Sequence, residues 1–299
     1  MAVRGHLPLA RLNGQVALVT GAGRGVGRAI ALALGDAGAT VAACARSKDD
    51  VTAVAGEIAG RRGHALAFRC DVTERHEVEG MVAAVQDTLG PVDLLVSNAG
   101  QFGPVGPLAA TDPDEWWQAL EVNLRGPLYC ARAVLPGMLA RGRGRIVNVS
   151  SSAGLAATPM LSAYAVSKTA LYRLSENLAA ETRGHGVAVF TINPGLVRTA
   201  MSEAALSCGE PSVEQWFAGA FASQQDVPAD FAATLVVYLA SGAADALSGR
   251  IIRVSADVAQ LVARAAEIEA HDLYVLRERD DVPGHGPVTL TDAERDTAG

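Results

Sequence analysis

The feature that most constrains this chain is a regular alternation of short apolar segments with longer segments of helical periodicity. Seven short segments have the composition and length of buried strands: Val16–Thr20, Thr40–Cys44, Ala65–Arg69, Val92–Val96, Arg145–Val149, Val187–Ile192 and Arg250–Val254. Between them, segments such as Val26–Ala37, Asp49–Arg61 and Glu74–Leu89 place apolar residues at the spacing of one helix face. Strands that alternate with helices of this length are typical of a parallel sheet covered on both faces.

The alternation predicts an α/β fold with one domain. Residues 1–257 are expected to form a single doubly wound, Rossmann-type domain, with a parallel sheet of about seven strands and helices on both faces. No linker rich in Pro, Gly or Ser divides this range. Residues 258–299 are interpreted as an extension, with an amphipathic helix at roughly Val258 to Glu269 and a charged tail. We expect this tail to form an oligomer arm or to be partly disordered.

Composition excludes several classes of protein. The net charge of −7 argues against a nucleic-acid surface, which needs a basic stripe. No apolar run approaches the roughly 18 residues of a membrane span, and residues 1–14 lack the apolar stretch of a secretory signal. The four cysteines are far apart, which predicts reduced thiols in a cytoplasmic protein, and the six scattered histidines give no metal-ligand spacing.

A glycine-rich turn follows the first predicted strand and opens the first predicted helix. It reads Thr-Gly-Ala-Gly-Arg-Gly-Val-Gly from Thr20 to Gly27. Glycine lets the backbone approach a pyrophosphate, and the helix N-terminus supplies free N–H groups and a positive dipole end. We predict that this turn binds a dinucleotide through Gly21, Arg24, Gly25, Val26 and Gly27; the alternative is an ordinary tight strand-to-helix turn.

The end of the second predicted strand bears on the choice of cofactor. An NAD site needs a carboxylate there for the ribose 2′-hydroxyl, but residues 43–47 contain no acid, and Asp36 falls at the end of the preceding helix. Arg46 and Arg24 offer two guanidinium groups to a 2′-phosphate, which favours NADP(H) over NAD(H). The alternative for Arg46 is a solvated loop arginine.

A tyrosine and a lysine share a predicted helix face. Tyr164 and Lys168 are four residues apart, in a chain with only two lysines, so a chance pairing is improbable. A phenol with a pKa near 10 is a poor acid at neutral pH. A cation about 4 Å away, worth roughly 4 kcal/mol at an effective dielectric of 20, lowers that pKa by about three units at most. The pair therefore suits general acid–base catalysis.

Taken together, the motifs resemble the short-chain dehydrogenase/reductase family, and in particular NADP-preferring members similar to 3-oxoacyl-carrier-protein reductases. The resemblance spans roughly Gln15 to Val254. It rests on ordered elements: the glycine turn, Asp71-Val72, Ser97-Asn98-Ala99-Gly100, Asn123, Ser151, Tyr164-x-x-x-Lys168 and Asn193-Pro194-Gly195 followed by Thr199. Ser97 stands where the family most often has Asn, and we expect little effect from this difference.

The resemblance implies four catalytic residues. Tyr164 would exchange the proton with the substrate oxygen, and Lys168 would lower the Tyr164 pKa and bind the nicotinamide ribose. Ser151 would orient the substrate oxygen, although its neighbours Ser150 and Ser152 leave the choice dependent on spacing. Asn123 would help to hold a proton-relaying water chain; the alternative is a buried helix amide.

The resemblance also implies where the cofactor lies. Asp71 and Val72 would border the adenine, and Asn98, Ala99 and Gly100 would line the cofactor beside the fourth strand. Pro194, Gly195 and Thr199 would pack on the nicotinamide carboxamide. No resident metal is expected.

The implied function is an oxidoreductase that transfers a hydride between NADP(H) and a carbonyl or secondary-alcohol substrate, with ketone reduction favoured. A predicted lid suggests an apolar or ring-bearing substrate: Met201, Leu206, Trp216, Phe217 and Phe221. The alternative is a catalytically idle NADP(H)-binding sensor or interaction protein. The family suggests a homodimer or homotetramer, but Ser255-Ala256-Asp257 and the extension replace the usual Asp-Gly-Gly end. This departure puts the tetramer in doubt and raises the expectation that the extension adds a wall to the pocket.

Overall fold

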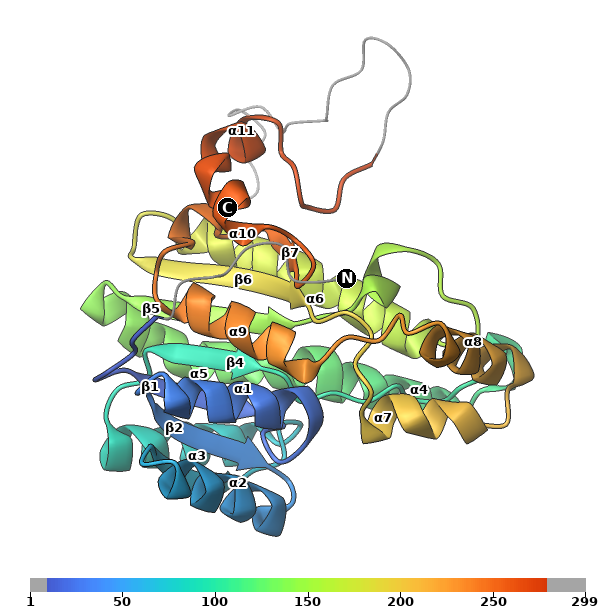
Figure 1. Cartoon of the computed structure of the whole chain (residues 1–299), viewed down its shortest axis with the longest axis horizontal. Helices are drawn as coiled ribbons and strands as arrows, with labels where there is room; N and C mark the ends of the chain where they lie inside the picture. Colours follow the sequence, from blue (N-terminus) through green and yellow to red (C-terminus); the bar gives the residue numbers. More distant parts are fainter. Residues whose placement is uncertain (1–9, 279–299) are drawn as a thin grey trace.

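The computed structural model describes residues 10–278, which form a seven-stranded parallel sheet in the order β3-β2-β1-β4-β5-β6-β7 (Figure 1). All six strand pairings are parallel. The strands are β1 (Val16–Thr20), β2 (Thr40–Ala45), β3 (His64–Arg69), β4 (Leu94–Ser97), β5 (Gly144–Val149), β6 (Val187–Asn193) and β7 (Ile251–Arg253). The predicted fold class is confirmed, with each strand within two residues of its expected ends.

Helices cover both faces of the sheet. One face carries α1 (Gly25–Asp36), α2 (Lys48–Gly60) and α9 (Ala229–Ala240), and the other carries α3 (Arg75–Leu89), α5 (Gly126–Arg141) and α6 (Ser162–Glu181). Figure 1 shows α1 and α9 packed side by side in front of the sheet. Strand residues alternate between the two layers, so that Val19 packs with the first group and Leu18 with the second. The central strands are therefore mostly apolar because neither of their sides faces water, whereas the edge strand β3 is partly exposed.

Shorter helices lie at the carboxyl end of the sheet. They are α4 (Pro113–Leu120), α7 (Ala200–Ala204), α8 (Pro211–Ala222) and the single turns η1 (Leu108–Ala110), η2 (Glu121–Arg125), η3 (Ser152–Leu155) and η4 (Ala205–Ser207). A further turn, η5 (Asp245–Leu247), lies at the opposite end of the sheet, just before β7. The η2 turn is a π-helical turn between α4 and α5, a local widening that is frequent at functional sites. Phe217, Phe221, Val213 and Ala205 form a small apolar cluster of their own within this region.

The extension differs from the single helix predicted for it. It forms two short helices, α10 (Val258–Ala263) and α11 (Ala265–Ala270), because the backbone leaves helical geometry at Arg264. The chain then returns along β7, where Ile251 N–H donates to the carbonyl of Tyr274 at 2.8 Å. Arg250 pairs with Asp272 at 3.0 Å beside this contact. The remaining part of the predicted tail lies outside the described residues.

The sheet order places a crevice between β1 and β4. The chain runs outward from β1 through β2 to β3 and then crosses back to β4 on the other side of β1. Ligands of open parallel sheets bind at the carboxyl ends of strands at such a reversal.

Among the described residues, no helix is both long enough and apolar enough to cross a membrane.

Candidate active site

A cavity of about 880 Å³ opens at the carboxyl ends of the strands, above the crevice between β1 and β4. Its walls come from the glycine turn, the ends of β2, β4 and β5, the start of α6, and the segment from Pro194 to Phe217. All the predicted site residues line this cavity except Gly27 and Asn123. The structure thus gathers residues that are up to 178 positions apart in the chain, from Gly21 to Thr199.

The glycine turn is held against β4 by Asn98. The Asn98 side-chain amide donates to the carbonyls of Thr20 at 3.1 Å and Gly21 at 3.2 Å. Gly21 has a left-handed φ of 63°, which glycine adopts without strain. A Cβ on Gly27 would lie 2.2 Å from the Gly21 carbonyl oxygen. Gly27 is therefore buried behind the turn and shapes it, whereas the sequence predicted it as a cofactor-contacting residue.

The N-terminus of α1 is open toward the cavity. Arg24 occupies the N-cap position and its side chain makes no capping hydrogen bond, so the first backbone N–H groups of α1 are free for an anion. The side chain of Thr199 approaches from the other wall, 3.2 Å from where a Cβ of Gly25 would lie. A pyrophosphate fits between these elements.

Arg24 and Arg46 lie exposed at one end of the cavity. Within residues 10–278 neither side chain forms an ion pair. Asp36 pairs instead with Arg61 at 3.1 Å, away from the cavity, which confirms that it is not placed as a ribose ligand. Sequence reasoning missed Asp50, which also lines this end and packs directly against Gly23.

The middle of the cavity is lined by the other predicted cofactor residues: Val26, Asp71, Val72, Ala99, Gly100, Pro194 and Gly195. Asp71 holds its own loop, since one carboxylate oxygen accepts from the backbone N–H of Thr73 at 3.0 Å and from its hydroxyl at 2.8 Å. The second carboxylate oxygen carries no hydrogen bond to a described residue. The residues present therefore fit a dinucleotide along this wall.

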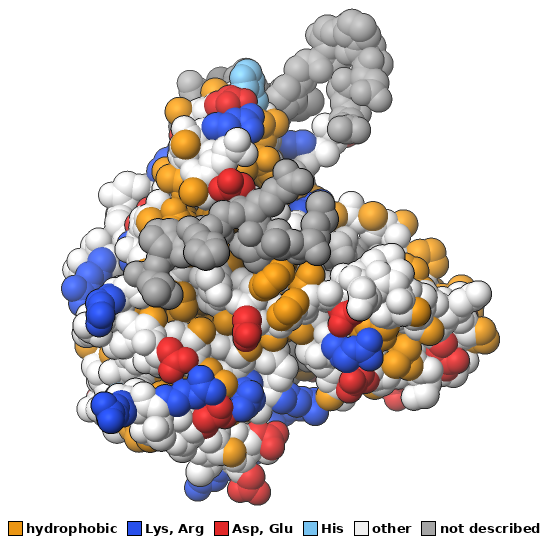
Figure 2. All heavy atoms as spheres, viewed as in Figure 1, with side chains coloured by type: hydrophobic (Ala, Val, Ile, Leu, Met, Phe, Trp, Pro, Cys, Tyr) orange, Lys and Arg blue, Asp and Glu red, His pale blue; other side chains and the backbone are white. Residues whose placement is uncertain are grey.

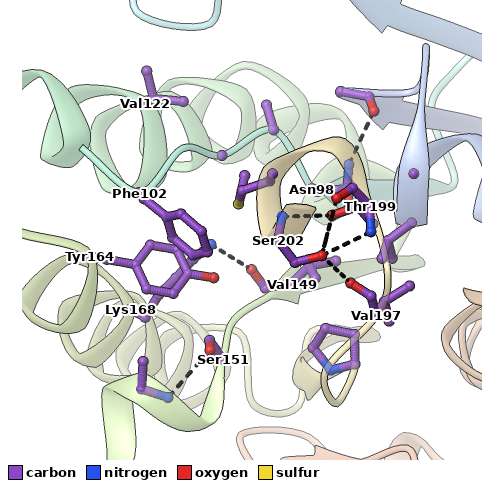
Figure 3. A pocket seen from close by; sticks show the side chains of 18 of the residues that line it. Asn98, Phe102, Val122, Val149, Ser151, Tyr164, Lys168, Val197, Thr199 and Ser202 are labelled. Atoms are coloured by element: carbon purple, nitrogen blue, oxygen red, sulfur yellow. Dashed lines mark hydrogen bonds between the residues drawn. The ribbon is translucent and has the colours of Figure 1, made fainter. Parts of the chain in front are cut away.

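Tyr164, Lys168 and Ser151 meet at the inner end of the cavity (Figure 3). Burial raises the pKa of the Tyr164 phenol, and a hydrogen bond with the Ser151 hydroxyl partly lowers it. Lys168 is buried, and its Nζ donates to the Val149 carbonyl at 3.0 Å. Burial lowers the pKa of Lys168 to about 8.

This electrostatic arrangement differs from the sequence-based expectation. The Lys168 Nζ lies 5.6 Å from the centre of the Tyr164 ring, and burial, not the lysine charge, dominates the pKa of the tyrosine. The amino group is directed at a backbone carbonyl and is itself destabilised in its charged form. Ser151 is the group that lowers the Tyr164 pKa here.

The three adjacent serines have separate roles. The Ser150 hydroxyl is buried and donates to the Lys168 carbonyl at 3.1 Å, which fixes the end of β5 on α6. Ser152 is exposed at the start of η3. Of the three serine side chains, only that of Ser151 lowers the pKa of Tyr164, which favours the predicted choice.

Asn123 is fully buried in the π-helical turn and does not line the cavity. Its amide nitrogen donates to the Gln101 carbonyl at 2.8 Å and the Ser167 hydroxyl at 2.9 Å. Its carbonyl accepts from Gln101 N–H at 2.9 Å. The side chain is thus committed to joining α6 to the loop after β4, and a part in a water chain stays a prediction.

Comparison with known proteins agrees with this site. A family model described as short chain dehydrogenase matches residues 15–207. The short chain dehydrogenase pigC of Monascus ruber is 36% identical over 271 residues, which cover 88% of this chain and 86% of that protein. The chain belongs to the short-chain dehydrogenase/reductase family. It is therefore an oxidoreductase of a family that uses a nicotinamide cofactor.

Solved structures of this family differ in the cofactor they hold. A putative NAD(P)-dependent gluconate 5-dehydrogenase from Beutenbergia cavernae, solved with NADP, is 34% identical with a TM-score of 0.75 over 83% of this chain and 97% of that one. A xylitol dehydrogenase solved with NAD⁺ is 27% identical with a TM-score of 0.75, over 81% and 97%. The shared fold therefore does not by itself choose between the two cofactors.

The cavity has an aromatic wall beyond Tyr164. Phe102 meets Tyr164 edge to face, with ring centres 4.8 Å apart, and its other neighbour Phe217 lies at 6.0 Å. Trp216 packs edge to face on Phe217 at 4.8 Å and is 59% exposed. Of the predicted lid residues, Met201, Trp216 and Phe217 line the cavity, whereas Leu206 and Phe221 do not.

The described part of the extension does not reach the cavity. None of the described residues of the extension, 258–278, lines the cavity, so this part adds no wall to the pocket.

Sequence reasoning missed Phe102 and Tyr172, although Phe102 follows the Asn98–Gly100 motif closely enough to have been a signal. No group of three His, Cys, Asp or Glu side chains suited to a metal ion occurs in the part of the chain that the structure describes.

Proposed function

We propose that this protein is an NADP(H)-dependent carbonyl reductase that acts on neutral, apolar or ring-bearing ketones. One observation carries the proposal: Ser151, Tyr164 and Lys168 meet at one end of a cavity whose other end presents Arg24 and Arg46. This placement along one cavity suits a dinucleotide whose reactive end faces the tyrosine. In this respect the protein follows the NADP-preferring, 3-oxoacyl-carrier-protein-reductase-like members that its sequence resembles.

The free guanidinium groups support NADP(H) over NAD(H). Arg24 and Arg46 have no carboxylate partner among residues 10–278, and charge-assisted hydrogen bonds from arginine suit a phosphate. The open N-terminus of α1 would hold the pyrophosphate, with Asn98 keeping the glycine turn in place. Lys168 would bind the nicotinamide ribose, and Pro194, Gly195 and Thr199 would border the nicotinamide ring.

The three catalytic side chains have separate roles in the transfer of a proton to the substrate oxygen. Bound NADPH supplies the hydride to the carbonyl carbon. Tyr164 donates its phenolic proton to the carbonyl oxygen, and Ser151 donates a hydrogen bond to the same oxygen and orients it. The Lys168 charge, when present, favours the tyrosinate left after proton transfer. In the reverse direction Tyr164 accepts the proton from the alcohol.

The substrate side of the cavity carries no charge among the described residues. Its lining includes Phe102, Leu161, Leu196, Met201, Val213, Trp216 and Phe217. The charged lining side chains are Arg24, Arg46, Asp50, Asp71 and Lys168, all on the cofactor side. No group there would pair with a sugar-acid carboxylate, in contrast to the substrate for which the related gluconate 5-dehydrogenases are named. The uncharged lining therefore favours a neutral ketone, and the aromatic side chains favour one that carries a ring.

On the face shown in Figure 2, acidic and basic side chains are interspersed, with no basic stripe of the kind that binds nucleic acid. Assembly as a homodimer or homotetramer and a cytoplasmic location stay predictions from the sequence.

Fluorescence titration with NADPH and NADH, followed by a ketone panel monitored at the NADPH absorbance band, tests the proposal. We expect tighter binding of NADPH and faster turnover of aryl ketones than of keto-sugar acids. Tight binding without turnover of any carbonyl would favour the alternative, a catalytically idle sensor. A preference for NADH would refute the cofactor assignment, and no binding of either nucleotide would refute the whole proposal.

A further inference from the structure

A second tyrosine follows the catalytic pair on the same face of α6. Tyr164, Lys168 and Tyr172 are spaced by four residues, so their side chains lie above one another along the helix. Tyr172 is 3% exposed and does not line the cavity. A buried phenol needs hydrogen-bond partners, and the partners of this one lie in the catalytic loop.

The Tyr172 hydroxyl contacts the backbone of the catalytic serine. It donates to the Ser151 carbonyl oxygen at 2.9 Å, and the neighbouring Ser150 side chain partly lowers the pKa of Tyr172. Ser150 in turn donates to the carbonyl of Lys168. Burial raises the pKa of Tyr172 to about 12, so the phenol keeps its proton and remains a donor across the working pH range.

Ser151 needs such support because the sheet ends just before it. The last backbone hydrogen bond to β6 runs from Ser150 N–H to the Ile192 carbonyl at 2.9 Å. Beyond this point the Ser151 carbonyl is held by Gly154 N–H at 3.0 Å, within the same short turn, and by Tyr172 from α6. Tyr172 therefore ties the serine peptide to the helix that carries Tyr164.

We propose that Tyr172 is a positioning residue: its hydroxyl fixes the Ser151 peptide to α6 and so keeps the Ser151 hydroxyl aligned with Tyr164 and the substrate oxygen. This inference rests on the proposed carbonyl reduction. Tyr172 does not touch substrate or cofactor and acts entirely through Ser151. Its loss should thus weaken the chemical step and spare the binding of NADPH.

A double-mutant cycle with Ser151 tests this dependence. Tyr172→Phe should lower kcat by about fivefold to tenfold, the effect of losing one neutral hydrogen bond, with KM for the ketone and Kd for NADPH unchanged. In the Ser151→Ala background the same substitution should have no further effect, because the group that it positions is gone. Tyr238→Phe is the matched control, since Tyr238 is also a buried tyrosine but lies on α9 outside the cavity. It should leave kcat unchanged.

A spectroscopic readout needs no turnover. With the five tyrosines labelled with carbon-13 at the phenol carbon, the Tyr164 signal is assigned by its loss in Tyr164→Phe. Its chemical shift reports the hydrogen bonding of the phenol. Tyr172→Phe should move this signal in the same direction as Ser151→Ala, and adding it to Ser151→Ala should move the signal no further.

Equal kcat in Tyr172→Phe and wild type would overturn the proposal, and so would the same loss in both serine backgrounds, which would indicate a general effect on stability. An unmoved Tyr164 signal would also overturn it. If the wild-type protein reduces no carbonyl, the proposed function fails, while the Tyr164 signal still decides the role of Tyr172.

Discussion

The amino group of Lys168 lies 5.6 Å from the centre of the Tyr164 ring and is hydrogen-bonded to a strand carbonyl, not to the phenol. Burial acts on the two groups in opposite directions: it raises the pKa of the tyrosine and lowers the pKa of the lysine to about 8. Burial thus favours the neutral phenol and the neutral amine. A neutral phenol suits the proposed role of Tyr164, which is to hold its proton until the substrate oxygen accepts it.

The buried lysine should cost stability. Its pKa falls from 10.5 to about 8, a difference of about 3 kcal/mol against the folded state near neutral pH. Lys168→Met removes that penalty but leaves the Val149 carbonyl without its donor, which costs about 1–2 kcal/mol. We expect Lys168→Met to abolish turnover and to raise the free energy of unfolding in urea by about 1–2 kcal/mol.

The pH dependence identifies the cause of that gain. Because the unfolded chain binds the Lys168 proton more tightly than the folded one, the penalty is complete below about pH 8 and disappears as pH rises to 10.5. The stability difference between Lys168→Met and wild type should shrink over this window. A variant that is less stable than wild type near neutral pH would contradict the argument.

Tyr164→Phe removes only the hydroxyl that exchanges the proton. General acid–base catalysis contributes about 10²–10⁴-fold, so kcat should fall by at least about 10²-fold while NADPH fluorescence titration is unchanged. Tyr129→Phe is the control, because that hydroxyl accepts from Arg125 outside the cavity. Wild-type turnover in Tyr164→Phe would exclude the proposed acid.

Arg46→Ala should separate the two nucleotides. Loss of one charge-assisted hydrogen bond to a 2′-phosphate should weaken NADPH binding about tenfold to a hundredfold and leave NADH binding unchanged. Arg28→Ala, which removes an ion pair with Glu57 on the outer side of α1, should alter neither. Equal losses for both nucleotides would show that Arg46 does not read the phosphate.

The sheet could be predicted closely because its central strands are buried on both sides, which leaves a continuous apolar signal in short segments. Thr40 and Val187 begin strands where the sequence predicts them. The break at Arg264 was not predicted, since the apolar spacing continues across it from α10 to α11. The segment around Tyr274 that runs along β7 has no sequence periodicity from which its position could be predicted.

The site could be predicted where function fixes residue type and spacing, as for Tyr164 and Lys168. It was missed where the contact depends on how distant elements pack. Phe102 reaches Tyr164 across 62 positions, and Tyr172 reaches Ser151 across 21. For Asn123 the sequence left two roles open, and the structure shows the side chain facing inward and hydrogen-bonded to the backbone of Gln101.

Gly27→Ala should disable cofactor binding by deforming the turn. The added Cβ would lie 2.2 Å from the Gly21 carbonyl oxygen and 2.3 Å from the Asn98 amide, so the backbone must shift. We expect a loss of about 1–3 kcal/mol in stability together with loss of NADPH binding. Gly80→Ala on α3 meets nothing within 4 Å and should gain about 0.5–1 kcal/mol with binding intact. Unaltered NADPH binding in Gly27→Ala would contradict the inference that Gly27 shapes the glycine turn.

The extension should contribute stability and not catalysis. Ile268 on α11 is 1% exposed and packs into the core on the α9 side of the sheet, so Ile268→Ala should cost about 2–5 kcal/mol in thermal or urea unfolding. Because residues 258–278 line no part of the cavity, KM for the ketone and Kd for NADPH should stay at wild-type values. Leu273→Ala is the control within the same segment: its side chain is 37% exposed, and the change should stay within about 0.5 kcal/mol. Altered kinetics in Ile268→Ala at unchanged stability would instead assign this segment to the active site.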